Sequence, residues 1–326
     1  MKCFYHTRYR FYKPQISTTP SFFLISDVHF SPKVHSGRLN AITKHAAQQK
    51  PDYIIIAGDL VDSLDAIDTT AKLRRLCAWL TRLGEVAPVF IGLGNHDFYR
   101  CNPKYKNIFS KERHWYTADN QHLTDALRNL DNVHLLDNQS FEDRQLYIFG
   151  FTTSPDYYQL DHEDSTTTVF HPGNEDKNIL RLDLKQLDPK LLHDLPPRKA
   201  KIAIVHSPVY LNDPAIAPFF ADFDFIISGH MHNGIVPPLI NDFWHSDRGF
   251  YAPGKHFFPH QSRGHVASAN QKTIICGAVS TFQDSAKPLT FLNAGFPVFT
   301  ASLECTHRET YARKPDVKRQ YLSFPK

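Results

Sequence analysis

Five short apolar runs in this sequence each end in a cluster of Asp, Asn or His residues. The runs and their clusters read SFFLISDVHF, YIIIAGDLVD, VFIGLGNHD, IAIVHSP and FDFIISGHMH. Runs of about four to eight apolar residues that are bounded by polar ones predict buried strands. Because open α/β sheets collect their ligands at the carboxyl ends of the strands, we expect these clusters to lie together in one site.

The segment between the second and third runs has helical spacing. Apolar residues recur along it from Leu64 to Leu83, which predicts a helix over residues 62–83, with Asp62 as the N-cap and Gly84 as the stop. A helix that joins two strands predicts a parallel crossover. The same patterns predict a helix and a strand over residues 120–136, further strands at 147–151, 273–281 and 297–305, and a polar insertion at 157–178.

Composition limits the class of protein. The chain has 326 residues, of which 41% are hydrophobic and 21% charged, as is typical of a compact globular protein. A net charge of +4 allows anionic partners without requiring nucleic acid. The opening has no apolar core like that of a signal peptide, and no run approaches the roughly 18 apolar residues of a membrane span. We therefore expect a cytoplasmic protein.

The two ends of the chain are richer in basic residues than the middle. We predict a basic and aromatic N-terminal segment (1–20), a central domain (21–305) and a basic C-terminal tail (306–326). Both ends are expected to be solvated and partly disordered, although peripheral contact with a membrane or with nucleic acid stays open. The five cysteines are odd in number and lack C-x-x-C spacing, which favours reduced thiols.

The polar clusters also occur in a characteristic order. They are Asp-x-His at Asp27 and His29, Gly-Asp-x-x-Asp at 58–62, Gly-Asn-His-Asp at 94–97, a single His206, and Gly-His-x-His at 229–232. Each cluster alone has an ordinary explanation as a cap or a turn. All five together, in this order, resemble the calcineurin-like metallophosphoesterases. The segment after residue 235 looks like that of the small bacterial phosphodiesterase-like branch.

The resemblance implies a fold and a metal centre. The fold would be a four-layer α/β/β/α sandwich of the metallo-dependent phosphatase type, built as one domain around two divalent ions. By resemblance, Asp59 bridges both ions. The remaining ligands are Asp27, His29 and His232 at one ion, and Asn95, His206 and His230 at the other. Imidazole, carboxylate and amide ligands without a thiolate suit Mn, Fe, Zn, Ni or Co.

The implied reaction is hydrolysis of a phosphoester. Two divalent cations, two aspartates and one bridging hydroxide leave the centre at about +1, which attracts an anionic phosphoryl oxygen. The ions would lower the pKa of bridging water to about 7, giving a hydroxide for in-line attack on phosphorus. His96 matches the family histidine that stabilises the transition state or protonates the leaving oxygen. Asp97 either orients His96 or caps the turn, and Asp62 is expected to be a helix cap that supports the site from outside.

Residues 241–270 are expected to form loops around the site, because proline, glycine and aromatic residues alternate there. Within them, Arg248, Lys255 and Arg263 are predicted to contact the substrate, since cations bind phosphate oxygens well. The leading hypothesis is a phosphodiesterase that acts on a small-molecule phosphoester. A nuclease is the second hypothesis, which the modest charge disfavours. A catalytically silent scaffold is the third, but such a protein should have lost ligands, whereas all seven positions are filled.

Overall fold

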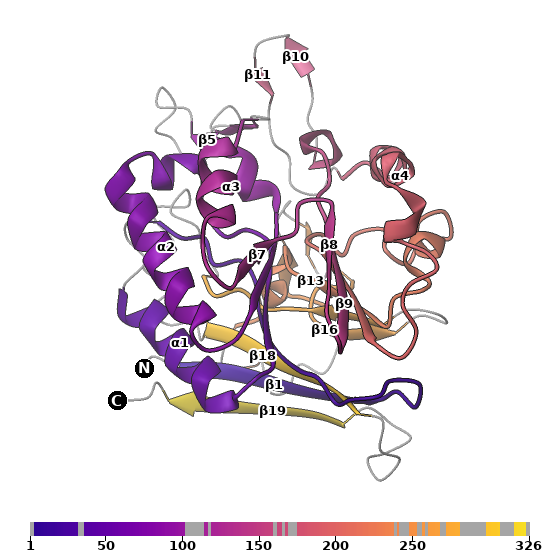
Figure 1. Cartoon of the computed structure of the whole chain (residues 1–326). Coiled ribbons are helices and arrows are strands. Elements are labelled where there is room, and N and C mark those ends of the chain that lie inside the picture. Colours follow the sequence, from indigo (N-terminus) through magenta and orange to yellow (C-terminus); the bar gives the residue numbers. More distant parts are fainter. Residues whose placement is uncertain are drawn as a thin grey trace.

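Two stacked β-sheets with helices on both outer faces form the fold (Figure 1). The structure is a computed structural model. It describes residues 3–31, 36–101, 114–116, 119–158, 162–164, 167–168, 175–237, 240, 248–252, 256–257, 260–267, 272–280, 298–306 and 316–323. The predicted α/β/β/α sandwich is confirmed, since α1, α2 and α3 lie on one side of the paired sheets and α4 on the other.

The first sheet has seven strands among the described residues. Its strands, in spatial order, are β19 (Asp316–Ser323), β1 (Cys3–Tyr12), β18 (Val298–Thr306), β2 (Ser21–Ile25), β3 (Tyr53–Ala57), β4 (Val89–Gly92) and β7 (Val133–Leu135). Five of them, β2, β3, β4, β7 and β18, were predicted. Strands β2, β3, β4 and β7 are parallel, so their carboxyl ends share one edge. Strand β18 runs antiparallel to β2.

The second sheet has six strands. Their spatial order is β16 (Gly264–Ala267), β17 (Lys272–Ile275), β13 (Phe225–Ser228), β12 (Ala200–Val205), β9 (Leu146–Phe151) and β8 (Gln139–Glu142). The four central strands are parallel, and β8 and β16 are antiparallel edges. Short ribbons are formed by β5 (Tyr99–Cys101) with β6 (His114–Tyr116), by β10 (His162–Asp164) with β11 (Thr167–Thr168), and by β14 (Tyr251–Ala252) with β15 (His256–Phe257).

Side chains of the central strands alternate between the core that separates the two sheets and a core beneath the helices. In β2, Phe22 and Leu24 face the second sheet and join the core between the sheets, whereas Phe23 and Ile25 face the helices. In β9, Ile148 enters the core between the sheets. Strands β3 and β4 are buried along their whole length and are continuous apolar runs, so their periodicity could not reveal the second sheet.

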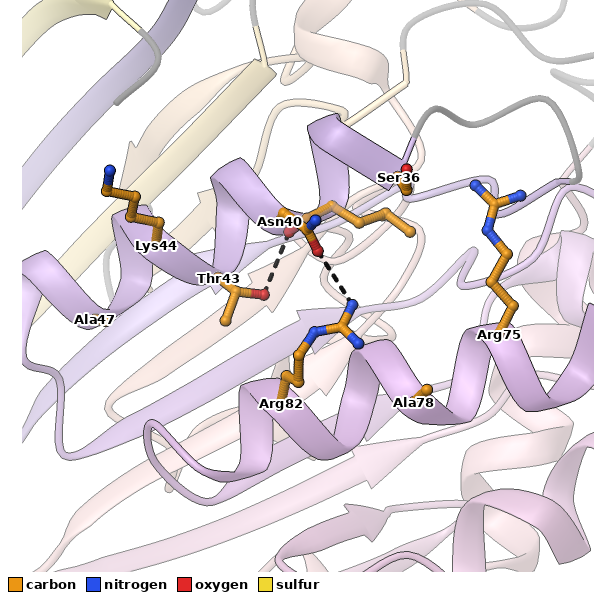
Figure 2. Close-up of a pocket in the computed structure, with 9 residues that line it drawn as sticks. Ser36, Asn40, Thr43, Lys44, Ala47, Arg75, Ala78 and Arg82 are labelled. Atoms are coloured by element: carbon orange, nitrogen blue, oxygen red, sulfur yellow. Dashed lines mark hydrogen bonds between the residues drawn. The ribbon is translucent and has the colours of Figure 1, made fainter. Parts of the chain in front are cut away.

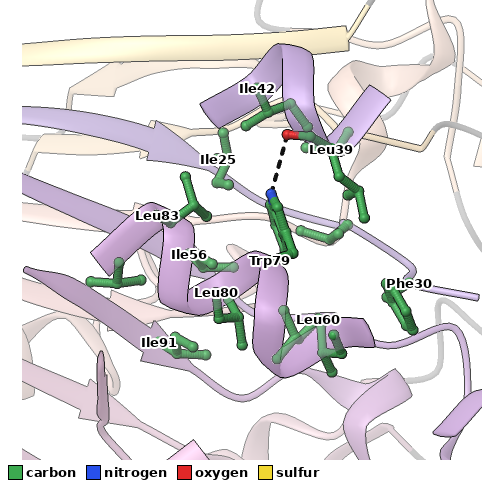
Figure 3. Packing of buried hydrophobic residues seen from close by; sticks show 14 of the residues in the cluster. Ile25, Phe30, Leu39, Ile42, Ile56, Leu60, Trp79, Leu80, Leu83 and Ile91 are labelled. Carbon is green, nitrogen blue, oxygen red and sulfur yellow. Dashed lines mark hydrogen bonds between the residues drawn. The ribbon is translucent and has the colours of Figure 1, made fainter. Parts of the chain in front are cut away.

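The helices are α1 (Ser36–Gln49), α2 (Thr70–Gly84), α3 (Gln121–Arg128) and α4 (Lys177–Gln186). The first three cover the first sheet, and α4 covers the second through Leu180 and Leu184. Trp79 of α2 is fully buried beneath α1, and its indole Nε1 donates a hydrogen bond to Leu39 O at 3.2 Å (Figure 3). This side chain therefore joins the two helices as well as filling the core.

The predicted start of the second helix is wrong. The helix begins at Thr70, and the N-cap is Thr69, whose hydroxyl accepts a hydrogen bond from Lys72 N. Residues Leu64–Ile67 form a separate 3-10 turn. Asp62 is therefore not the helix cap, because the polar residues before Thr69 interrupt the helix that apolar spacing alone suggested. Helix α1 was not predicted; its apolar residues are less clearly gathered on one face than those of α2 and α3.

The expectation of partly disordered ends is wrong for residues 3–12 and 316–323. Strand β1 lies between β18 and β19, with Phe4, Tyr9 and Phe11 buried. Its aromatic residues alternate with basic ones, so the segment was interpreted as polar when it is a strand. The division of the chain at residues 20 and 305 stays a prediction, although strands from both outer segments pair within the first sheet.

Candidate metal centre

Backbone strain marks the residues that follow the strands. Asp27, His29, Asp59, His230 and His232 have φ angles of 50°, 45°, 52°, 68° and 47°. A non-glycine residue enters this left-handed region at a cost of about 1–3 kcal/mol, and such residues cluster at functional sites. The surrounding fold must stabilise all five, as expected of a preorganised site.

Asp27 joins the two sheets through hydrogen bonds. Its carboxylate accepts from the Ser26 hydroxyl and from the backbone N–H of His230, which lies 3.0 Å from Oδ1. Its own N–H donates to Gly58 O at 3.1 Å. Burial raises the pKa of Asp27, but the neighbouring His232 outweighs burial and holds the pKa below its usual value. The buried carboxylate is therefore ionised, and Oδ1 lies 3.4 Å from His232 Nε2.

His29 and His232 face each other through ring nitrogens. Their Nε2 atoms are 3.1 Å apart. Burial, followed by the nearby His96, lowers the pKa of His29 well below its usual value, so the His29 ring is neutral. Two ligands at about 2.1 Å from one ion, at a right angle, lie about 3.0 Å apart. The observed separation therefore fits two nitrogens that share one ion.

His206 presents one ring nitrogen to Asp59. Its Nδ1 donates to Ala57 O at 2.7 Å, which fixes the ring. Its Nε2 is buried without a hydrogen-bond partner among the described residues, 3.2 Å from Asp59 Oδ2. Burial lowers the pKa of His206, but the Asp59 carboxylate outweighs burial and raises it to about 9. Positive charge is therefore favoured at this point, and a metal ion would supply it to both atoms.

Asn95 opens the turn after β4 and is held in one orientation. Its Nδ2 donates to the Tyr99 hydroxyl at 3.0 Å, which leaves Oδ1 to face His230 Nδ1 at 3.1 Å. An amide oxygen and an imidazole nitrogen at this distance again match two ligands of one ion. Tyr99 was not among the predicted residues, and no motif distinguishes it from the other tyrosines.

His96 lies beside the two clusters. Its Nδ1 donates to the backbone carbonyl of Asp62 at 2.7 Å, and its ring centroid is 4.5 Å from that of His29. Burial lowers its pKa, so the ring is neutral with a lone pair on Nε2. Asp62 thus supports His96 from outside the clusters, through its backbone.

The carboxylate of Asp97 caps the turn that follows β4. Its Oδ1 accepts from Val61 N at 3.0 Å and its Oδ2 from Gly94 N at 2.9 Å. Burial, followed by the charge of Asp59, raises the pKa of Asp97 to about 7. The carboxyl group therefore ties the turn after β4 to the turn after β3.

The carboxylate of Asp59 is shared by two groups of potential ligands. One group is Asp27, His29, Asp59 and His232, and the other is Asp59, His206 and His230; the ligand atoms of each lie within 4.8 Å of one another. Burial raises the pKa of Asp59, but the charges of His206 and His96 hold it well below its usual value. With Asn95 beside His230, the structure brings together all seven residues that were predicted as ligands. These buried oxygen and nitrogen donors fit two divalent ions.

A third potential group, His29, Asp62 and His96, overlaps the first through His29. The nitrogen Nδ1 of His96 is already engaged by the Asp62 carbonyl. Among the described groups, only the first two share a carboxylate, so they form the better pair of metal sites.

Of the residues that were predicted to contact the substrate, the two that the structure describes differ in their exposure to solvent. Arg248 is exposed, and the neighbouring Phe250 N–H donates to Gly234 O at 2.8 Å, next to the turn of His230 and His232. Lys255 lies outside the described residues. Arg263 is only 3% exposed and lines a cavity of about 20 Å³, so its placement gives no support to a substrate contact. The expectation of loops throughout 241–270 is wrong at 251–252, 256–257 and 264–267, which form β14, β15 and β16.

A groove of about 710 Å³ lies between α1 and α2 (Figure 2). Its lining residues are Ser36, Leu39, Asn40, Thr43, Lys44, Ala47, Arg75, Ala78 and Arg82. Arg82 donates across it to Asn40 Oδ1 at 3.2 Å. The lining contains none of the carboxylates or histidines of the metal centre, so this groove is not the place of the chemistry.

Comparison with known proteins agrees with these motifs. The model of the calcineurin-like phosphoesterase family matches residues 20–234. The chain belongs to this family. An uncharacterized metallophosphoesterase of Campylobacter jejuni is 23% identical over 227 residues, which are 70% of this chain and 48% of that protein. A transmembrane protein with a metallophosphoesterase domain from Bos taurus is 25% identical over 219 residues, which are 66% of this chain and 41% of that protein.

The chain spans less than half the length of both relatives. A crystal structure of a dimetal phosphatase from Danio rerio, at 13% identity, covers 82% of this chain and 88% of its own, with a TM-score of 0.42. No helix in the described part of the chain has the length and apolar character needed to cross a membrane. Cytoplasmic localisation stays a prediction.

Proposed function

We propose that this phosphoesterase is a dinuclear-metal-dependent hydrolase and that its substrates are phosphodiesters of small molecules. The observation that carries the proposal is the Asp59 carboxylate, which belongs to both groups of potential ligands. We assign Asp27, His29 and His232 to one ion, Asn95, His206 and His230 to the other, and Asp59 to both. When bound, two such ions supply Lewis acidity and lower the pKa of water so that it can attack phosphorus.

The protein side chains supply orientation and proton transfer. His96 is buried next to His29, and the Asp62 carbonyl fixes its ring by accepting a hydrogen bond from Nδ1. We assign His96 to stabilising a substrate oxygen in the transition state and to protonating the leaving group. Asp97 supports it by tying down the turn that carries Asn95 and His96.

The substrate class is supported by charge. Asp27 and Asp59 are the ionised carboxylates in the two groups of potential ligands, and two divalent cations would exceed their charge. An excess of positive charge favours an anionic phosphoryl group over a neutral ester. The preference for diesters is supported by the resemblance of the segment after residue 235 to the small bacterial phosphodiesterase-like branch of the family.

Hydrolysis of bis-p-nitrophenyl phosphate tests the proposal. We expect Mn²⁺-dependent release of nitrophenol that chelation abolishes, and slower release from p-nitrophenyl phosphate. Asp59→Asn should abolish turnover, and His96→Ala should lower it by about 10²–10⁴-fold. Asp68→Asn and His193→Ala are matched controls at exposed ion pairs, and both should retain full activity.

Two outcomes would favour other functions. Efficient cleavage of single-stranded or duplex DNA at physiological salt, with poor hydrolysis of small diesters, would indicate a nuclease. A folded protein that hydrolyses no phosphoester with any of Mn²⁺, Fe²⁺, Zn²⁺, Ni²⁺ or Co²⁺ would indicate an interaction scaffold and contradict the proposal.

A further inference from the structure

We propose that Glu175 is a positioning residue for the metal ion of Asn95, His206 and His230, and that it acts by orienting the His230 ring. This inference rests on the proposed function, because it concerns one of the two assigned metal sites. Glu175 belongs to none of the motifs and lies in the polar insertion predicted over residues 157–178.

The two nitrogens of His230 have different neighbours. Nδ1 lies 3.1 Å from Asn95 Oδ1, whereas Nε2 lies 3.0 Å from Glu175 Oε1. The group of potential ligands within 4.8 Å of one another contains Asp59, His206 and His230 but not Glu175. Nδ1 therefore faces the site of the ion, and the carboxylate of Glu175 sits on the outer side of the ring.

The backbone next to Glu175 is fixed. Asp176 N donates to Tyr157 O at 2.9 Å, and the Asp176 carboxylate caps α4 by accepting from Asn178 N at 2.7 Å. Helix α4 is in turn packed against the second sheet. The Tyr157 hydroxyl donates to Ser207 Oγ at 3.1 Å, one residue after His206. These hydrogen bonds connect the backbone beside Glu175, through Tyr157, to the residue that follows the ligand His206.

The contact between Glu175 and His230 is shielded from water. Their side chains are 7% and 4% exposed, and the Tyr158 ring lies 5.6 Å from the His230 ring. A charged hydrogen bond is stronger in such surroundings than at the surface. The cost of leaving either group without a partner is correspondingly high.

The chemical consequence follows from where the proton lies on His230. When Nε2–H donates to the Glu175 carboxylate, Nδ1 keeps its lone pair and the ring is held at a fixed angle. The carboxylate also makes the imidazole a stronger donor to the ion. Carboxylates that orient a ligating histidine in this way typically account for about 10–100-fold in metal affinity.

Calorimetric titration with Mn²⁺ tests the inference without any use of turnover. Wild-type protein should bind two ions per chain. Glu175→Ala should weaken one of the two affinities by about 10–100-fold and leave the other unchanged. Glu175→Gln, which keeps an acceptor but removes the charge, should lose less. Asp213→Asn is the matched control. Asp213 Oδ2 lies 3.0 Å from Lys177 Nζ at the start of the same helix, so the substitution removes this ion pair without changing the surroundings of His230.

The outcomes separate this inference from the proposed function. If wild type binds two ions and both Glu175 variants bind them equally well, Glu175 has no positioning role. An equal loss at both sites would also overturn the inference, because it would indicate a general disturbance of the fold. If Glu175→Ala does not fold, the affinity of Glu175→Gln decides. Failure of wild type to bind two ions would contradict the proposed function itself.

Discussion

Replacing Gly58 with alanine tests how the fold positions the metal centre. Gly58 has a φ of +84°, where an alanine costs about 1–2 kcal/mol. The added Cβ would lie 2.3 Å from Nδ1 and 2.6 Å from Cγ of His206, where ordinary contacts begin at 3.4 Å. The His206 ring would therefore have to move by about 1 Å away from Gly58.

The size of the effect follows from the contacts that this movement breaks. The ring would lose the hydrogen bond from Nδ1 to Ala57 O, at a cost of about 0.5–1.5 kcal/mol. Overpacking of a rigid site adds about 1–3 kcal/mol. With the backbone strain, we expect Gly58→Ala to lower the free energy of unfolding by about 3–6 kcal/mol.

Urea denaturation with chelator and with Mn²⁺ measures both consequences. At an Mn²⁺ concentration of about 100 times its Kd, wild type should gain about 2.7 kcal/mol, and the variant should gain much less because His206 is displaced. Gly37→Ala, in the exposed first turn of α1, is the matched control and should be neutral or slightly stabilising. A loss below about 1 kcal/mol for Gly58→Ala, with an unchanged gain from Mn²⁺, would refute the reasoning.

Two further predictions concern the first sheet and its helices. His6 and His45 are buried, and two of their ring nitrogens lie 3.2 Å apart. Burial, followed by the nearby His45, lowers the pKa of His6 to about 3. Burial also lowers the pKa of His45, to about 4. Because the unfolded chain takes up these protons near pH 6.5 and the folded one does not, stability should fall as the pH drops below 6.5, and His6→Gln should flatten that dependence in urea titrations. Trp79→Ala should lower the free energy of unfolding by about 3–5 kcal/mol. Trp79→Phe, which removes the indole donor to Leu39 O, should lower it by less than this but by more than a substitution at an exposed position. Equal stability of Trp79→Phe and wild type would show that this hydrogen bond contributes nothing.

Much of the site could be predicted because its chemistry needs particular residue types at strand ends. Asp27, Asp59, His206 and the pair at His230 and His232 each follow a continuous apolar run, so both the strand and the ligand are visible in the sequence. The left-handed turns at Asp27, Asp59, His230 and His232 are local, and they bring these side chains together once the parallel strands are aligned.

The missed features depend on contacts between distant segments. Strand β1 is stabilised by pairing with β18, nearly 300 residues away, and no local pattern reports that pairing. Glu175 reaches His230 only because α4 packs on the second sheet. Asp97 was left open between two roles, and only the three-dimensional structure shows its bonds to Gly94 and Val61. Arg263 was predicted from charge alone, which carries no information about burial.

The central claim is that one carboxylate, that of Asp59, is shared by two metal ions. A crystal structure with added Mn²⁺, in which the ions are located by their anomalous scattering, tests this most directly. The account predicts two peaks per chain with Asp59 in contact with both, and at most one well-occupied peak in Asp59→Asn. A single ion in wild type, or two ions of which only one contacts Asp59, would contradict it.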